Sequence, residues 1–255
     1  MTASVVLALS TSLGVAHVLA LRIQGQWPAQ WAQVHGLGAA LCFEFRIEDY
    51  RQQSLELLPR LQQAMVQANL TPADIAVIGV DTGPGGFTSL RTACGVAQGL
   101  SVAWAKPVVP VCSLHAMAVQ ALVTGQHAAQ GECVSAIDAR LNEVYVARID
   151  WERETPFLSP GLMAIDQWPA YATTRAQVVC DAALLELLAR EAQSTTAQPQ
   201  SLVQAHRPAL GVAYLAFQGL STGQVHGPEA CQPMYVRDKV AQTTQERMAE
   251  RHGHL

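Results

Sequence analysis

Blocks of apolar and polar residues alternate along the chain and predict strands that alternate with helices. Residues 4–12 are an apolar run that ends in a polar turn, and residues 14–23 are a second run rich in β-forming residues, so we predict an opening hairpin. Apolar positions between Asp49 and Leu70 recur at helical spacing. Pro59 falls inside that helix and is expected in its first turn or at a kink.

The alternation continues through the middle of the chain. The pattern predicts a buried strand over 75–81, a helix over 88–104, a short strand over 108–111 and a helix over 113–123. Strands that alternate with helices favour an α/β fold with an at least partly parallel sheet. The last third has a weaker pattern, from which we predict a helix over 209–220, a closing strand or turn over 233–240 and a polar tail over 243–254.

The opening hairpin has a counterpart further along the chain. Residues 8–18 align without gaps on residues 136–146, and each copy reads as strand, polar turn, strand. Gly14 faces Asn142 in this alignment, and both residue types tolerate a positive φ angle in a turn. Two domains that open with the same hairpin indicate an internal duplication, although two generic hairpins can also coincide by chance.

Composition narrows the class of protein. Half of the 255 residues are apolar and 14% are charged, which is enough for a sizeable core. A net charge of −4 gives no overall attraction to nucleic acid or to an anionic membrane, so any RNA contact is expected to be local or made through a partner. Six widely spaced cysteines without a CxxC pair favour reduced thiols in a cytoplasmic protein, and no apolar run approaches the roughly 20 residues of a membrane span.

A glycine turn, Gly83-Pro84-Gly85-Gly86, joins a predicted strand to a predicted helix. The first turn of a helix is a favourable place for an anion, which makes a phosphate cradle one interpretation. A P-loop would also need a lysine, however, and a dinucleotide-binding turn would need a further glycine, and this stretch has neither. A tight turn that lets the helix pack on the sheet is the favoured interpretation, with anion binding as the alternative.

No other pattern in the sequence predicts catalysis. There is no GxSxG elbow and no histidine pair at metal-ligand spacing, so we expect no catalytic residue, no metal and no cofactor. Asp138 stands at a predicted strand end beside Arg140, where it could anchor the turn or hold Mg²⁺ through water. The matching position in the first copy is Ser10, which supplies no carboxylate. An actin-like phosphotransferase needs acids on both sides of its cleft, and in this sequence the acid of the first copy would be missing.

Two helices have surfaces suited to close packing. The helix over 88–104 carries small residues at two positions four apart on each of two adjacent faces: Ala93, Gly95, Ala97 and Gly99. Each glycine costs about 1 kcal/mol of helix propensity, which suggests a packing role. The helix over 54–68 is apolar on more than one stripe. These helices could pack only within their own domain, or they could form an exposed apolar patch for a partner, and the pattern leaves both alternatives open.

Five motifs in order resemble the bacterial TsaB (YeaZ) family. They read LALSTS, RQQSLELLP, GPGGFTSLR–GVAQGL, AIDARLNEVY and PMYVRDKVA, and the family typically has LALDTS, REHSQxLLP, GPGSFTGLR–GxAQGL, AIDARxxEVY and PxYLR. The resemblance covers residues 5–150 and 233–241. The departures from the family pattern lie around the predicted cleft and put nucleotide or metal binding in doubt: Ser10 for aspartate, Gln53 for histidine, Thr82 for arginine, and Gly86 and Ser89 for serine and glycine.

The resemblance implies an actin/Hsp70-like (ASKHA) α/β fold of two related βαβ lobes with mixed sheets flanked by helices. The first lobe would span 1–113 and be completed by 233–245, the second, degenerate lobe would span 114–232, and 243–255 would be a polar tail. The implied role is a non-catalytic scaffold subunit in forming N6-threonylcarbamoyladenosine next to the anticodon of tRNA. The implied partners are the catalytic paralogue TsaD and the ATPase TsaE, with tRNA met only through the complex, homodimers when alone and no membrane.

The resemblance also implies two sets of site residues. The partner-binding set lies on the two helices and consists of Leu57, Leu58, Leu61, Ala64, Met65, Ala68, Thr92, Gly95, Val96 and Gly99. A vestigial nucleotide-binding set consists of Ser10, Gly83, Gly85, Gly86 and Asp138. The alternative function is an ATP-dependent phosphotransferase or glycoprotease-like peptidase of the same superfamily. Direct tRNA binding by this chain is a third hypothesis, against which the net charge argues.

Overall fold

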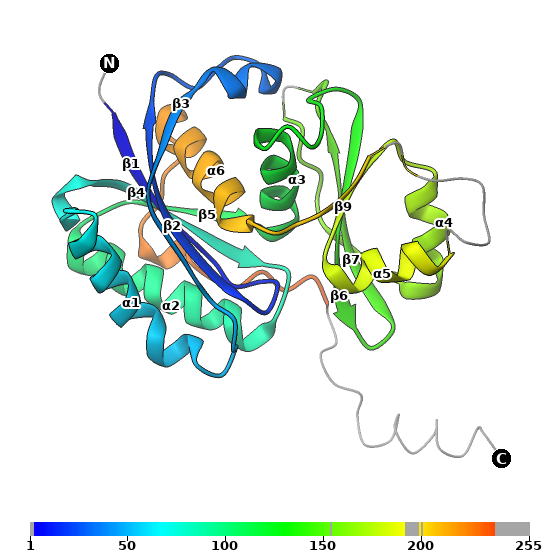
Figure 1. The fold of residues 1–255 in the computed structure, drawn as a ribbon, viewed down its shortest axis with the longest axis horizontal. Helices are drawn as coiled ribbons and strands as arrows, with labels where there is room; N and C mark the ends of the chain where they lie inside the picture. The colour runs from blue at the N-terminus through cyan, green and yellow to red at the C-terminus, as the bar shows by residue number, and fades with distance from the viewer. Residues whose placement is uncertain (1–2, 154, 192–198, 200, 238–255) are drawn as a thin grey trace.

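A computed structural model describes residues 3–153, 155–191, 199 and 201–237 of the chain. Two five-stranded sheets stand side by side, each flanked by helices (Figure 1). We refer to the part built on the first sheet as the first lobe and to the part built on the second sheet as the second lobe. No helix among the described residues is long and apolar enough to cross a membrane.

The first sheet has the strand order β3-β2-β1-β4-β5. Its strands are β1 (Ser4–Ser10), β2 (Ala16–Gln24), β3 (Gly38–Ile47), β4 (Ile75–Gly83) and β5 (Val108–Cys112). The predicted opening hairpin is the antiparallel pair β1 and β2, to which β3 adds antiparallel, while β4 and β5 run parallel to β1. The sheet is therefore mixed, with its parallel half made by the predicted strand–helix alternation.

The second sheet repeats this order as β10-β9-β6-β7-β8. Its strands are β6 (Glu132–Arg140), β7 (Glu143–Asp150), β8 (Gly161–Ala164), β9 (Gln177–Cys180) and β10 (Ser201–Gln204). The hairpin β6–β7 takes the place that β1–β2 takes in the first sheet, β8 adds antiparallel to it, and β9 and β10 add parallel. The two aligned hairpins thus occupy equivalent places in two similarly ordered sheets.

Helices cover both faces of the first sheet. Helix α1 (Gln53–Gln67) and helix α2 (Phe87–Trp104) pack on one face, while α3 (Ser113–Val123) and α6 (Pro208–Thr222) pack on the other (Figure 1). Helix α3 also packs on the inner face of the second sheet, and α4 (Trp168–Thr173) and α5 (Ala182–Glu191) cover its outer face. Short 3-10 helices complete the chain: η1 (Trp31–Gly36), η2 (Pro72–Asp74), η3 (Ile165–Gln167) and η4 (Pro228–Ala230).

Helix α6 belongs to the core of the first lobe although it follows the second sheet in sequence. Val212, Ala213 and Ala216 are fully buried with residues of β1 and β4. A Cβ atom added to Gly79 of β4 would lie 2.7 Å from the Cβ of Ala216, so only glycine allows this helix so close to the sheet. Sequence reasoning placed 208–222 inside the second lobe. The domain boundaries stay a prediction, and the predicted tail over 243–255 lies outside the described residues.

The segment over 233–240, predicted as a closing strand or turn, is neither a strand nor a turn where it is described. Residues 231–237 run without regular secondary structure from η4 to the junction of the lobes, and residues 238–240 lie outside the described part. This segment crosses the end of β4, where the Met234 N–H donates to the Thr82 carbonyl at 2.7 Å. It therefore acts as a link between the lobes rather than as an additional strand of either sheet.

Candidate functional site

Helices α1 and α2 lie next to one another on the outer side of the first lobe and leave an apolar surface in contact with solvent. Besides Phe87 at the start of α2, four large apolar side chains on these helices are exposed, at 76% for Leu55, 48% for Leu58, 70% for Val66 and 70% for Val102. A groove of about 480 Å³ runs between the helices and is lined mainly by apolar residues: Leu58, Pro59, Leu61, Gln62, Met65, Val66, Leu70, Pro72, Leu100 and Trp104. We call the outward surface of α1 and α2 the helix-pair face.

The small residues of α2 divide between its two sides. Ala93 and Ala97 are fully buried against the sheet, whereas Gly95 and Gly99 are exposed. Apart from the backbone of α2 and the neighbouring residues, no described atom lies within 4 Å of where their Cβ atoms would be. Nothing inside the described chain therefore requires glycine at 95 or 99. Two glycines four residues apart on an outward helix face expose backbone that another helix could approach closely.

The structure places the predicted partner-binding residues in three groups. Leu58, Gly95 and Gly99 are exposed, and Ala64, Ala68, Thr92 and Val96 are partly exposed. Three members of the set are buried against the sheet and support α1 from within, although two of them also line the groove: Leu57, Leu61 and Met65. Whether they contact a partner stays a prediction. Sequence reasoning missed Leu55, Val66 and Val102, whose apolar side chains lie off the buried stripe of each helix and could have been noticed for that reason.

The glycine turn packs tightly against the end of the first hairpin. A Cβ added to Gly85 would lie 2.6 Å from the Ser12 carbonyl oxygen, and the Gly86 N–H donates to that same oxygen at 3.1 Å. A Cβ added to Gly83, whose φ is 109°, would lie 2.8 Å from a methyl group of Leu90 in α2. Two of the three glycines thus allow β1, the turn and α2 to pack together, as the favoured structural interpretation requires.

A buried carboxylate that sequence reasoning missed lies beneath this turn. Asp81 of β4 has no exposed surface, and its carboxylate accepts hydrogen bonds from the Ser10 hydroxyl at 2.6 Å, the Ser113 hydroxyl at 2.5 Å and the Gly83 N–H at 3.0 Å. Burial raises the pKa of Asp81, and the hydrogen bonds from Ser10 and Ser113 oppose that rise. The sequence does place Asp81 at the end of the apolar run IAVIGVD, and this position could have marked it as a buried acid.

Asp81 changes the interpretation of Ser10. The first lobe does have an acid next to position 10, supplied by the neighbouring parallel strand rather than by β1 itself. That acid is enclosed by its donors and has no exposed surface, so it does not present an oxygen to the cleft. The arrangement anchors the ends of β1 and β4 and the start of α3 to one another.

A cleft of about 330 Å³ separates the glycine turn from the second lobe. Gly85, Gly86 and Asp138 of the vestigial nucleotide-binding set line it, whereas Ser10 and Gly83 do not. Asp138 is held in its own turn, since it accepts from the Arg140 N–H at 2.8 Å and pairs with the Arg140 guanidinium at 3.0 Å. The structure therefore brings three of these five residues together.

Other polar side chains also line the cleft: Ser12, Tyr145, Asp181, Tyr235 and Arg237. Asp181 accepts from the backbone N–H groups of Asp138 and Leu184, each at 3.0 Å, and burial raises its pKa. The buried Ser12 hydroxyl makes no hydrogen bond of ordinary geometry to a described residue, but it adds to the groups that lower the pKa of Asp81 against the effect of burial. Within the described residues, no group of three or more His, Cys, Asp or Glu side chains could hold a metal ion.

Comparison with known proteins finds similar sequences for part of the chain and similar folds for most of it. Residues 49–156, less than half of the chain, match the family model described as TsaD, tRNA N6-adenosine threonylcarbamoyltransferase. The chain is 35% identical over 103 residues to the tRNA threonylcarbamoyladenosine biosynthesis protein TsaB of Haemophilus influenzae, covering 40% of this chain and 42% of that protein. It is 33% identical over 97 residues to the protein of the same name from Escherichia coli, covering 38% and 41% respectively. The matched region thus spans about two-fifths of these curated relatives.

Solved structures extend the likeness to the whole described fold. A protein from Pseudomonas aeruginosa similar to peptidase YeaZ superposes with a TM-score of 0.66 at 23% identity, covering 92% of this chain and 100% of the other. A structure of YeaZ from the same organism gives a TM-score of 0.65 at 23% identity over 91% and 99%. The predicted α/β fold class, with two mixed sheets flanked by helices, is confirmed, and these YeaZ structures share it. Together, the sequence matches over about two-fifths of the chain and the fold of the described residues make this chain similar to the TsaB and YeaZ proteins.

Proposed function

We propose that this chain is a non-catalytic scaffold subunit required for threonylcarbamoylation of the tRNA adenosine next to the anticodon. It pairs with the catalytic paralogue TsaD, works with the ATPase TsaE, and meets tRNA only through the complex. The names of the curated relatives support the pathway. The observation that supports a scaffold role is the helix-pair face, where Leu55, Leu58, Val66 and Val102 are exposed around an open groove.

The partner surface of this proposal consists of the exposed and partly exposed part of the predicted set, together with the three residues that the structure adds. Gly95 and Gly99 leave room on α2 for a helix of the partner, and the groove between α1 and α2 would accept its apolar side chains. Homodimers of the isolated chain would use the same surface. We place the protein in the cytoplasm because its six cysteines are all free and five of them are buried.

Substitution of Gly99 by Trp tests this proposal. The indole would fill the open space on α2 and block the approach of a helix, so we expect pull-down of TsaD to be lost. The isolated chain should stay folded, because no other part of the chain lies near the added Cβ and the substitution removes part of the glycine's helix-propensity cost of about 1 kcal/mol. Ala183→Trp is the matched control, since it places the same indole on an exposed position of α5 in the second lobe. Undiminished binding by the Gly99 variant would refute the proposed surface.

The alternative function, ATP-dependent phosphotransfer, has the cleft as its supporting observation. Asp138 and Asp181 lie on one side of it and the glycine turn on the other. Because Asp81 is fully enclosed and Asp138 is paired with Arg140, we expect no heat of binding when Mg-ATP is titrated into the chain. A micromolar affinity would instead favour an enzyme, and a peptidase would be recognised by turnover of a peptide substrate.

A further inference from the structure

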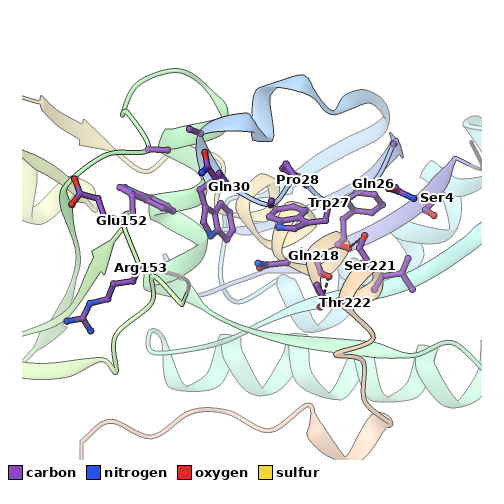
Figure 2. A pocket seen from close by; sticks show the side chains of 18 residues that line it. Ser4, Gln26, Trp27, Pro28, Gln30, Glu152, Arg153, Gln218, Ser221 and Thr222 are labelled. Carbon is purple, nitrogen blue, oxygen red and sulfur yellow. Dashed lines mark hydrogen bonds between the residues drawn. The ribbon is translucent and has the colours of Figure 1, made fainter.

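The loop between β2 and β3 reaches from the first lobe to the second. Trp31 at the start of η1 is buried, with its ring 5.4 Å from Trp151 and 5.3 Å from Phe157, both in the segment that follows β7. Figure 2 shows Trp27 and Gln30 of this loop and Glu152 and Arg153 of the second lobe around a shared cavity of about 980 Å³. An aromatic cluster of this kind resists separation of its members because the rings are packed and dehydrated.

Phe157 connects this cluster to α3. Its ring is stacked on His115 of α3 with centroids 4.6 Å apart, and the His115 Nε2–H donates to the Leu158 carbonyl at 3.0 Å. Phe157 is thus held between Trp31 of the first lobe and the helix that both sheets share. We call the set Trp31, His115, Trp151 and Phe157 the aromatic clamp.

A second set of contacts joins the two lobes across the cleft. Met234 is hydrogen-bonded to Thr82 of the first lobe, and the Arg91 guanidinium of α2 donates to the Tyr235 hydroxyl at 2.6 Å. Two residues later, the Arg237 guanidinium reaches the second lobe, where it donates to the Ala139 carbonyl at 3.0 Å and pairs with Glu143 at 2.5 Å. We call Met234–Arg237 the C-terminal strap.

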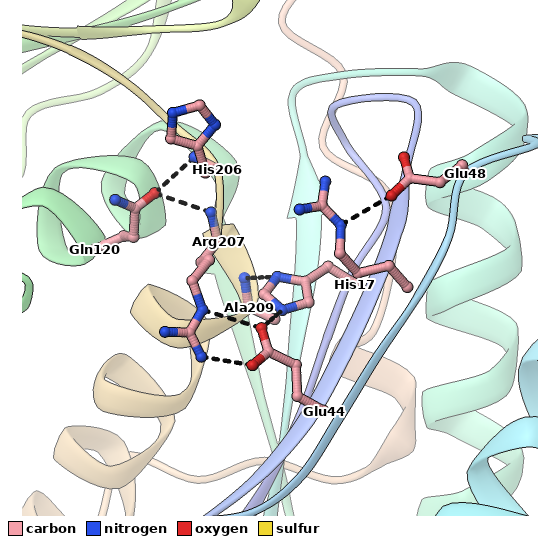
Figure 3. Close-up of polar contacts among 8 residues, drawn as sticks. His17, Glu44, Glu48, Gln120, His206, Arg207 and Ala209 are labelled. Carbon is pink, nitrogen blue, oxygen red and sulfur yellow. Dashed lines mark hydrogen bonds and ion pairs between the residues drawn. The ribbon is translucent and has the colours of Figure 1, made fainter.

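A polar cluster fixes the chain where it returns from the second lobe to α6. The Arg207 guanidinium donates to both oxygens of Glu44, at 3.0 and 2.6 Å, and the His17 Nε2–H donates to the same carboxylate at 2.7 Å (Figure 3). Gln120 of α3 accepts from the backbone N–H groups of His206 and Arg207 at 3.1 and 3.2 Å. The connection before α6 is therefore tied to β2, β3 and α3 and cannot serve as a free hinge.

We propose that the aromatic clamp and the C-terminal strap lock the two lobes in one arrangement, so that the chain does not open and close around its cleft. Figure 1 shows η1 at the top of the junction between the sheets and the strap segment at the bottom, with α3 between them. A rotation about α3 that widens one end must separate either the aromatic rings or the ion pair of Arg237. The proposal concerns motion of the chain itself and does not rest on the proposed function.

The distance between two spin labels, one on each lobe, tests this proposal in the full chain. Cys42 is the only partly exposed cysteine, so it takes the first label, and Glu186→Cys on the exposed side of α5 takes the second. The other five thiols are buried, which protects them from the reagent. We expect one narrow distance distribution from pulsed electron paramagnetic resonance, unchanged by Mg-ATP.

Removing contacts of both the aromatic clamp and the C-terminal strap should allow the lobes to move relative to one another. In Trp31→Ala/Arg237→Gln we expect the distribution to broaden and to shift to longer distances, with smaller effects in each single variant. Trp104→Ala removes an indole from the first lobe alone and should leave the distribution narrow. If Trp31→Ala/Arg237→Gln does not fold, the less disruptive double variant Phe157→Leu/Arg237→Gln takes its place. A broad or two-peaked distribution in the unsubstituted chain, a shift with Mg-ATP, or a narrow distribution in a folded double variant would overturn the proposal.

Discussion

The buried carboxylate of Asp81 gives the sharpest prediction about stability. Three elements meet at this group, because Ser10 ends β1, Gly83 ends β4 and Ser113 begins α3. Asp81→Ala removes the acceptor from all three donors at once. Asp81→Asn keeps the shape and one acceptor oxygen but removes the titratable proton.

The expected loss in Asp81→Ala follows from the donors left behind. A buried donor without a partner costs about 1–3 kcal/mol. The two serine hydroxyls can rotate toward other acceptors, whereas the Gly83 N–H cannot, and removal of a buried acid offsets part of the cost. We therefore expect a loss of about 2–3 kcal/mol in the free energy of unfolding, which lowers the melting temperature of a chain of this size by about 4–12 °C.

The pH dependence of Asp81→Asn tests the ionisation of the same group. Burial raises the folded-state pKa of Asp81 above the value of the unfolded chain, so its contribution is fully present at low pH and is lost as pH rises through the folded-state pKa. Asparagine does not ionise. The melting temperature of Asp81→Asn minus that of the unsubstituted chain should therefore become more positive as pH rises from about 4 to about 8.

Thermal unfolding followed by circular dichroism measures both effects. Glu186→Ala is the matched control, because that acid lies on the exposed side of α5 and pairs with the exposed Arg190 at 3.6 Å. Surface ion pairs contribute about 0–1 kcal/mol, so the control should change little. The reasoning fails if Asp81→Ala has the same melting temperature as the unsubstituted chain. It also fails if the difference in melting temperature between Asp81→Asn and the unsubstituted chain does not change with pH.

Further predictions concern the packing of two glycines, the pH dependence of stability and the accessibility of the cysteine thiols. Gly211→Ala should destabilise the chain by at least about 3 kcal/mol in chemical denaturation, because its Cβ would lie only 1.8 Å from the Ala116 carbonyl oxygen, whereas Gly95→Ala should stabilise it by up to about 1 kcal/mol. Burial lowers the pKa of His17 in the folded chain, so the unfolded chain takes up this proton at a higher pH than the folded chain does. The free energy of unfolding should therefore fall as pH drops below about 6.5. His17→Gln should make this fall smaller. In the folded chain only Cys42 should react rapidly with a thiol reagent, and rapid reaction of several cysteines would contradict the described burial.

The first lobe was largely predictable from the sequence. Its central strands are long apolar runs, and its helices have clear periodicity, so the alternation was visible without contacts. The second lobe was not, because β8, β9 and β10 have only four residues each and too little pattern to distinguish them from loops. Their pairing depends on the long hairpin β6–β7, which the sequence did reveal.

The candidate sites were predictable only in outline. The sequence indicated that α1 is apolar on more than one stripe, but which stripe faces the sheet depends on how α1 packs against β3. That packing buries Leu57 and Met65 and leaves Leu55 and Val66 outside. Asp81 was missed because two of its three donors, Ser10 and Ser113, come from other segments, and no local pattern joins a residue to donors that are far away in sequence.

Helix α3 has a consequence for how the chain folds. One side of it completes the core of the first sheet and the other side completes the core of the second, and α6 reaches the first sheet only after the second has been made. Neither half can finish burying its apolar residues without the other. The two halves should therefore melt in a single calorimetric transition, and a ribosome must release nearly the entire chain before the N-terminal half attains its final stability.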